Sequence, residues 1–298
     1  MRFSFWPTPS QAYDEVLALA RHVESSGWDG LWYADHFMPN AEDTSTPWPE
    51  AFTTLAALGA QVPRLRIGTL VAGNTYRHPA VLAKMAATMD HITGGRMVLG
   101  IGSGWQENEH RQYGLPFYTV AERLRRLDEA CQVIKLLYGN SKSTFDGRYY
   151  QLDDASLEPK PLQDPLPLLI GGGGEKVTLK ITAKYADEWN VWGTPDILEH
   201  KMAILDAHCA DAGRNPREIK RTAVALLFMS EDQGYLDKMR GAKLAQPSLI
   251  GTPAEICGLV QAYEALGVDE LIVPDFTLGG REQKLATLDT FIKDVAGR

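Results

Sequence analysis

The stretch Leu166-Pro167-Leu168-Leu169-Ile170-Gly171-Gly172-Gly173-Gly174-Glu175-Lys176 joins a short apolar run to four consecutive glycines. The run 166–170 is typical of a buried strand, and the segment 177–186 that follows has helical spacing. Glycines leave no side chain between the backbone and an approaching group, so several amide N–H groups can point at one anion. The following helix adds the positive end of its dipole. The stretch predicts a phosphate-binding turn, although glycine runs also occur in ordinary surface loops.

On both sides of this turn, short β-like runs alternate with longer helical runs. The eight expected strands are Arg2–Trp6, Gly30–Ala34, Leu65–Val71, Arg96–Ile101, Leu166–Ile170, Glu188–Val191, Thr222–Met229 and Glu270–Val273. A repeated β-then-α order implies parallel strands. Eight such units in 298 residues predict a (β/α)8 TIM barrel, with residues 1–298 forming a single domain. An open doubly wound sheet is the alternative, but no GxGxxG follows the first strand, which disfavours a Rossmann fold.

Helix signals and two insertions complete the pattern. The helix expected over 79–92 has a proline in its first turn and two glycines directly after its end. Other expected helices are 11–26, 51–61 and 120–138. A polar, proline-containing loop, 40–50, is inserted after the second strand. The segment 139–165 is inserted after the fourth strand, and its Asp146-Gly147 pair between aromatic residues predicts a hairpin.

Composition excludes several classes of function. The chain has 30 Lys and Arg against 38 Asp and Glu, a net charge of −8, which argues against a nucleic-acid surface. The three cysteines, Cys131, Cys209 and Cys257, lack CxxC spacing and suit a reducing cytoplasm. No apolar run approaches the roughly 20 residues that span a bilayer, and no secretory signal pattern opens the sequence. We expect a soluble cytoplasmic protein without a nucleic-acid or membrane partner.

The candidate chemistry lies after the strands, because the active site of a TIM barrel is at the C-terminal ends of its strands. Asp35-His36 follow the second expected strand, and the segments 72–78 and 102–110 follow the third and fourth. These loops are rich in glycine, hydrogen-bonding side chains and aromatic residues, which suits a planar aromatic cofactor with a phosphate tail. They contain no cluster of metal ligands and no GxSxG hydrolase elbow, so no metal site is predicted.

Several of these stretches occur together in a characteristic order along nearly the whole chain. They are Trp32–Phe37, Gly68–Pro79, Asp90–Arg96, Gly100–Trp105 and the glycine turn. In this combination the sequence resembles the luciferase-like monooxygenase superfamily, in particular its branch of oxidoreductases that depend on the deazaflavin coenzyme F420. The resemblance implies hydride transfer between F420 and a small organic substrate, commonly in a homodimer. Two alternatives remain: an FMN-dependent monooxygenase of the same superfamily, and a flavin-binding protein without turnover.

The resemblance also implies roles for individual residues. Asp35 and His36 are catalytic residues that face the cofactor's reactive edge; Asp35 also contacts the cofactor, and His36 acts as a general acid or base. The alternative for His36 is a structural hydrogen bond at the top of the barrel. The third strand ends in a bulge with a non-prolyl cis peptide near Leu70-Val71, behind the cofactor ring. The other implied cofactor contacts are Gly73, Asn74, Ser103, Gly104, Asn108, Gly171, Gly172, Gly173, Gly174 and Glu175. Asn108 could instead be a helix-surface residue.

The substrate side departs from one group of relatives. An apolar substrate wall is expected from Phe37, Trp48 and Trp105. In relatives that oxidise a sugar phosphate, an acidic residue occupies position 105 and a tryptophan occupies position 40, where this chain has Trp105 and Asn40. A tryptophan cannot transfer a proton as a carboxylate does, so glucose-6-phosphate dehydrogenase activity is not expected. Glu107 and Glu109 are expected to face solvent or to cap a helix.

Overall fold

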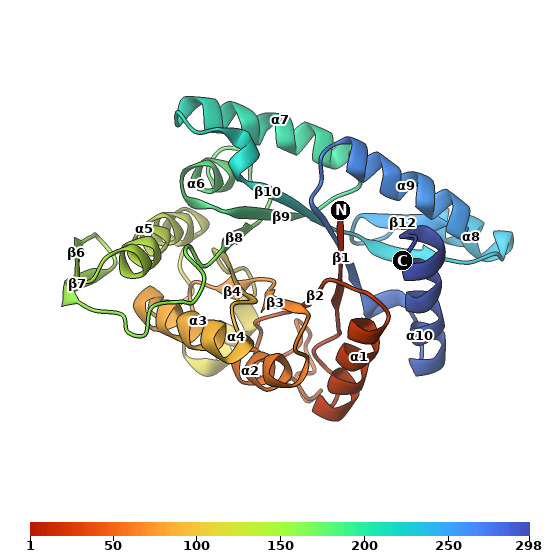
Figure 1. The fold of residues 1–298 in the computed structure, drawn as a ribbon, viewed down its shortest axis with the longest axis horizontal. Coiled ribbons are helices and arrows are strands. Elements are labelled where there is room, and N and C mark those ends of the chain that lie inside the picture. Colours follow the sequence, from red (N-terminus) through yellow and green to blue (C-terminus); the bar gives the residue numbers. More distant parts are fainter.

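The computed structural model describes residues 1–298 and contains a closed barrel of parallel strands (Figure 1). Its strands are β1 (Arg2–Trp6), β2 (Gly30–Tyr33), β3 (Arg66–Thr69), β5 (Met97–Gly102), β8 (Leu168–Gly171), β9 (Glu188–Trp192), β10 (Lys220–Val224) and β13 (Glu270–Pro274). They are ordered β3-β2-β1-β13-β10-β9-β8-β5. The barrel closes where β3 pairs with β5, with Ile67 opposite Met97 and Gly68 opposite Val98. The predicted TIM barrel is confirmed.

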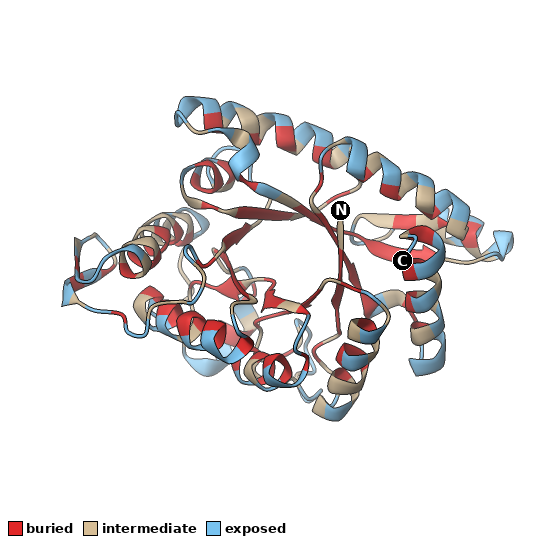
Figure 2. Cartoon of the chain, viewed as in Figure 1, coloured by how far each residue is buried: buried red, intermediate tan, exposed pale blue.

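Helices surround the barrel, with buried faces toward the strands and exposed faces outward (Figure 2). They are α1 (Tyr13–Ser25), α2 (Ala51–Gln61), α3 (Pro79–Thr93), α5 (Val120–Gly139), α6 (Thr178–Tyr185), α7 (Pro195–Asp211), α9 (Pro253–Ala265) and α10 (Arg281–Thr290). The start and stop signals of α3 act as expected: Pro79 lies in the first turn, and Gly94 ends the helix with φ +64°. None of the helices combines the length and the hydropathy needed to cross a bilayer.

Both predicted insertions are present. The chain from 34 to 50 after β2 forms a loop without helix or strand, and the hairpin of β6 (Ser143–Asp146) and β7 (Gln151–Ala155) lies between α5 and β8. A short helix, α4 (Glu107–Tyr113), follows β5.

A third insertion was not predicted. The expected strand 222–229 is two strands: β10 stays in the barrel, while β11 (Leu226–Met229) pairs with β12 (Ser248–Gly251) in a separate two-stranded sheet. Helix α8 (Gln233–Arg240) connects β11 to β12. The single-strand prediction is wrong because a continuous apolar run does not show where the chain changes partner strands.

Two apolar cores support the barrel. The larger core fills the space between the strands and the helices. A smaller core lies within the barrel and consists of Trp6, Trp32, Ala34, Leu70, Val98, Leu169, Val224 and Ile272. The inner core therefore supports the C-terminal ends of the strands from below, and Trp6 and Leu70 also reach the cavity described in the next subsection.

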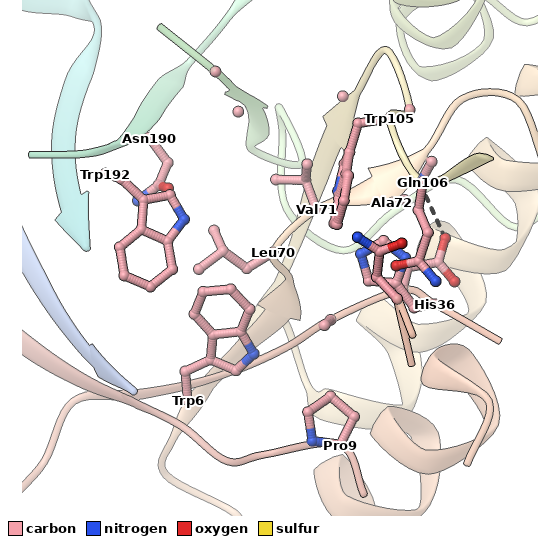
Figure 3. A pocket seen from close by; sticks show the side chains of 18 of the residues that line it. Trp6, Pro9, His36, Leu70, Val71, Ala72, Trp105, Gln106, Asn190 and Trp192 are labelled. Atoms are coloured by element: carbon pink, nitrogen blue, oxygen red, sulfur yellow. Dashed lines mark hydrogen bonds between the residues drawn. The ribbon is translucent and has the colours of Figure 1, made fainter. Parts of the chain in front are cut away.

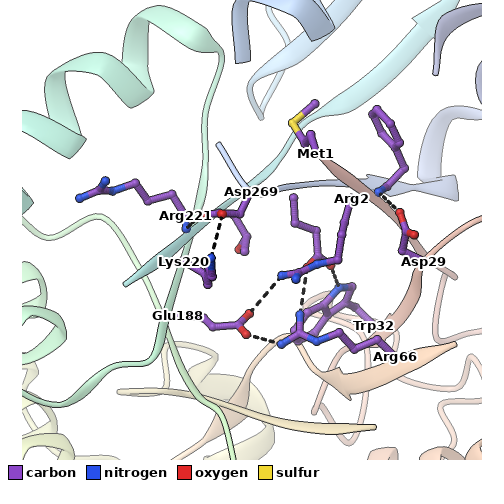
Figure 4. Close-up of polar contacts among 12 residues, drawn as sticks. Met1, Arg2, Asp29, Trp32, Arg66, Glu188, Lys220, Arg221 and Asp269 are labelled. Atoms are coloured by element: carbon purple, nitrogen blue, oxygen red, sulfur yellow. Dashed lines mark hydrogen bonds and ion pairs between the residues drawn. The ribbon is translucent and has the colours of Figure 1, made fainter. Parts of the chain in front are cut away.

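Four charged side chains fill the N-terminal end of the barrel (Figure 4). Arg2, Arg66, Glu188 and Glu270 are each the first residue of a barrel strand. Arg66 contacts Glu188, and the Arg66 Nη1 and Arg2 Nε atoms each lie 3.0 Å from the Glu270 Oε2 atom. The indole Nε1 of Trp32 donates to Glu270 Oε1 at 2.7 Å. Burial raises the pKa of Glu188, and the adjacent Arg66 opposes this shift.

Arg66→Ala is expected to lower the free energy of unfolding by about 3–5 kcal/mol, because it removes one of the two arginines that neutralise the buried carboxylates of Glu188 and Glu270. The matched control is Lys142→Ala, which breaks an exposed ion pair with Asp154 and should cost less than about 1 kcal/mol. Urea unfolding followed by circular dichroism measures both losses. Equal losses in the two variants would show that the charged network does not stabilise the barrel.

Candidate functional site

The C-terminal ends of the barrel strands surround a cavity of about 780 Å³. Almost every strand contributes to it, either directly or through the loop that follows. The contributions from strand ends include Trp6, His36, Val71, Ser103, Gly172, Trp192 and Phe276. Both the volume and the position suit a small-molecule site of a TIM barrel.

The floor of the cavity is the break between β3 and its two-residue continuation β4 (Ala72–Gly73). The peptide bond between Leu70 and Val71 is cis, as predicted. Gly102 and Gly171 flank Val71 so closely that a Cβ on either would come within 2.8 Å of its side chain. These two glycines therefore allow Val71 to lie on the cavity floor.

Asp35 is a buried anchor behind this floor. Its carboxylate accepts from Arg77 Nη1 at 2.7 Å, from Arg77 Nη2 at 3.0 Å and from the backbone N–H of Gly73 at 3.1 Å. Burial raises the pKa of Asp35, and the Arg77 guanidinium and the Gly73 N–H oppose that shift. Because its oxygens are occupied by these donors, the geometry gives Asp35 a positioning role and does not support the catalytic role predicted for it.

The side chain of His36 is held by Glu109, which was expected to face solvent or to cap a helix. Glu109 is completely buried, and its Oε1 atom lies 2.9 Å from His36 Nδ1. The same carboxylate accepts from the Tyr76 hydroxyl and, at 2.8 Å, from the N–H of Phe37. Burial and the nearby Glu109 raise the pKa of Tyr76, which keeps its hydroxyl protonated as a donor. His36 Nδ1 is the donor to Glu109, and its Nε2 atom has no partner within the protein.

The expectation that Glu109 faces solvent is therefore wrong, whereas its neighbour Glu107 is exposed. Both are polar residues in the first turn of α4, and nothing in their spacing distinguishes them. Glu109 is buried because α4 packs against the loop after β2, a contact between segments 73 positions apart.

The glycine turn leaves backbone donors free. The N–H of Gly172 donates to the carbonyl of Asn190 at 2.9 Å, but those of Gly173 and Gly174 have no acceptor in the protein. Gly172 has φ +131°, and a Cβ on Gly173 would lie 2.9 Å from the side chain of Val191. Glycine at these two positions therefore avoids backbone strain and crowding in a turn whose two free N–H groups are available to an anion.

Not all of the predicted turn residues line the cavity. Gly171, Gly172 and Gly173 do, whereas Gly174 and Glu175 lie outside its wall. The Glu175 carboxylate pairs with Lys201 at 2.5 Å and with His200 at 3.1 Å. Lys201, from α7, brings an ammonium group beside the turn that sequence reasoning did not identify.

The other predicted cofactor contacts also fall into two groups, those that line the cavity and those that do not. Gly73, Ser103 and Gly104 line the cavity, but Asn74 and Asn108 do not. Asn74 is buried and donates to the Tyr150 hydroxyl at 3.2 Å, and its Oδ1 atom has no partner. Asn108 donates to the carbonyl of Pro39 at 2.9 Å. Asn108 therefore holds the loop after β2 in place, which neither reading from the sequence anticipated.

Aromatic rings line two sides of the cavity (Figure 3). On the side of β2 and β5, Trp105 is 59% exposed and its ring meets that of His36 edge to face at 5.4 Å. On the opposite side, Trp6 lies 5.8 Å from Trp192 and 5.1 Å from Phe276. This second cluster had no predicted role, because the inward direction of a side chain at a strand end depends on register.

The residues of the predicted substrate wall lie in two places. Trp48 and Trp105 line the cavity. Phe37 does not line it: its ring packs on Tyr76 and Tyr113, at centroid distances of 4.7 and 5.3 Å. Phe37 lies in the loop after β2, and its N–H donates to the buried Glu109 carboxylate at 2.8 Å, on the side of α4.

Comparison with known proteins places this barrel in a family. The family profile of luciferase-like monooxygenases matches residues 1–236. The chain belongs to the luciferase-like monooxygenase family. The family resemblance read from the sequence is thereby confirmed.

Individual relatives within and around this family differ in cofactor. An F420-dependent glucose-6-phosphate dehydrogenase of Kineococcus radiotolerans is 34% identical over 222 residues, which is 73% of this chain and 65% of that protein. An FMNH2-dependent dimethylsulfone monooxygenase of Pseudomonas putida is 27% identical over 265 residues, covering 75% of this chain and 72% of that protein. The chain spans about half to two thirds of the length of the glucose-6-phosphate dehydrogenases that it matches.

A solved structure shows the same fold along the whole chain. The structure of an F420-dependent secondary alcohol dehydrogenase, in complex with an F420–acetone adduct, superposes with a TM-score of 0.84 at 20% identity. The match covers 99% of this chain and 97% of that chain. The insertions described above are therefore accommodated within a fold that the two chains share.

Glu109→Gln is expected to redistribute the proton on the His36 ring, because an amide can donate to Nδ1 whereas a carboxylate only accepts. Nitrogen-15 NMR of the ring nitrogens, in mildly alkaline buffer, should show a protonated Nδ1 and an unprotonated Nε2 in the parent protein. The variant should lose this distribution, while Glu107→Gln, an exposed neighbour on the same helix, should keep it. An unchanged pattern in Glu109→Gln would contradict the positioning role of Glu109.

Proposed function

We propose that the protein is an F420-dependent oxidoreductase that transfers hydride between coenzyme F420 and a small organic substrate. The observation that carries the proposal is one cavity with free glycine-turn N–H groups at one end and the unpartnered Nε2 of His36 on its wall. The F420-dependent dehydrogenases among the relatives support it.

The residues present fit a planar ring that carries a phosphate. The N–H groups of Gly173 and Gly174 would bind the phosphate, with Lys201 near enough to add charge. Leu70 and Val71 offer an apolar surface beneath the ring, and Gly73 leaves its edge open. When bound, F420 supplies two-electron hydride chemistry without activating oxygen.

The protein's own residues would handle the proton and the water. His36 Nε2 accepts the proton of a substrate hydroxyl during oxidation, or returns it to a carbonyl oxygen during reduction. The buried Glu109 carboxylate stabilises the imidazolium that forms and fixes the ring's orientation. Trp48 and Trp105 cover the cavity, and the loop 40–50 is the segment that would close over bound substrate.

The second candidate is an FMN-dependent monooxygenase. The dimethylsulfone monooxygenase relative favours it, and the glycine turn offers the same donors to the phosphate of either cofactor. The third candidate, flavin binding without turnover, does not explain why a buried Glu109 orients His36 at the cavity wall.

We further propose that the protein acts in the cytoplasm as a homodimer built from a single domain per chain. All three cysteines are free, with Cys131 and Cys209 buried, as suits a reducing compartment. Val81 and Ile92 are exposed apolar residues of α3 that a second copy could cover. Light scattering of the purified protein measures the dimer directly; a monomer mass would contradict it.

Titration with F420 and with FMN tests the choice of cofactor, because the fluorescence of each reports its binding. F420 should bind at least about ten times more tightly than FMN, a difference of about 1.4 kcal/mol. Tight FMN binding without F420 affinity would overturn the proposal in favour of the monooxygenase.

The same titration tests the phosphate position. Gly173→Asp should weaken F420 binding at least about 100-fold through charge repulsion, and the uncharged Gly173→Asn should weaken it much less. Gly280→Asp, at an open helix N-cap, is the control for added charge. Unchanged affinity in Gly173→Asp would remove the phosphate from the glycine turn.

A further inference from the structure

We propose that the substrate of this site is an uncharged, largely apolar or aromatic molecule with a single hydroxyl or carbonyl group at the reacting end. The inference rests on the proposed function and defines the class of its substrate. It starts from the charges on the cavity wall: no lysine or arginine is among the 26 residues that line it. The charged or titratable groups there are Asp35, His36 and Tyr76; the Asp35 carboxylate is already paired with Arg77, and the Tyr76 hydroxyl donates to Glu109.

Three cations that contact residues of the cavity wall or of the glycine turn are engaged outside the wall. Arg77 binds Asp35 and Glu50, and Arg123 donates to the carbonyl of Gly104 and to another backbone carbonyl. Lys201 pairs with Glu175 beside the glycine turn, where the cofactor phosphate is proposed to bind. A phosphate or carboxylate on the substrate would lose its water without gaining a counter-charge, which is strongly unfavourable. The chain's net charge of −8 adds long-range repulsion.

The wall facing His36 is instead aromatic. Trp6 lies in contact with both Trp192 and Phe276, and the three rings line the β1, β9 and β13 side of the cavity. Figure 3 shows Trp6 and Trp192 on this side. Trp105 keeps 59% of its surface exposed although it borders the cavity, so apolar area remains available for a ligand. Such rings stack on apolar or aromatic groups, while His36 Nε2 provides one hydrogen bond to an oxygen. The two features together select a molecule that is apolar except at its reacting end.

This class differs from that named for some relatives. The Kineococcus protein is named for glucose 6-phosphate, a dianion that needs cationic partners. The cavity of this chain offers none, so the two sites should differ in substrate charge although they share a fold.

Two probes with the same ketone test the inference: acetophenone and 4-acetylphenyl phosphate, titrated by calorimetry into the F420-loaded protein. Acetophenone should bind at least about ten times more tightly. Trp192→Ala should weaken acetophenone binding about tenfold, whereas Leu162→Ala, an exposed apolar residue outside the wall, should not change it. Gln246→Lys places a cation at the cavity mouth and should strengthen binding of the phosphate probe alone.

The outcomes separate the substrate class from the proposed function. Equal or tighter binding of the phosphate probe, or no binding of either probe, would overturn the substrate class even if F420 binds. Failure of F420 to bind, read from its own fluorescence, would overturn the proposed function. The same preference for acetophenone in FMN-loaded protein would then still support the substrate class.

Discussion

The buried ion pair between Asp35 and Arg77 is the constraint on which the site depends. Asp35 directly precedes His36, and the same carboxylate holds the N–H of Gly73 at the end of the cavity floor. Arg77 also reaches Glu50, whose carboxylate caps the first turn of α2 and ends the loop after β2. One pair of charges therefore fixes the histidine, the floor and the covering loop relative to one another, and its burial makes the loss of either partner costly.

Charged residues and apolar residues occupy different levels along the axis of the barrel. Paired charges occupy the N-terminal end, where Arg2 and Arg66 meet Glu188 and Glu270. The inner apolar core lies between these charges and the cavity, and the polar groups that line the cavity lie at the C-terminal end. There, buried Glu109 pairs with His36 on the cavity wall, and the N–H groups of Gly173 and Gly174 have no acceptor in the protein. The N-terminal end of the barrel therefore contributes to stability, and the C-terminal end carries the candidate site, as in other TIM barrels.

The fold could be predicted from the sequence because its signals act between residues that are close together in the chain. Strand and helix periodicity repeats along the chain, and signals such as Pro79 and Gly94 act within one helix. The errors concern contacts between distant segments. The strand 222–229 was read as one element because its break depends on pairing with β12, and Glu109 was placed in solvent because its partner is His36. Phe37 was expected on the cavity wall, but its ring packs on Tyr113, a contact that depends on where α4 lies.

The central claim is that one cavity holds the phosphate of F420 at the glycine turn and the ring over the break in β3. A crystal structure of the protein with F420 tests it most directly. The account predicts phosphate oxygens within hydrogen-bond distance of the Gly173 and Gly174 N–H groups, with the ring against Val71 and one ring face open toward His36. A phosphate bound away from the turn, or a ring outside the cavity, would contradict the account.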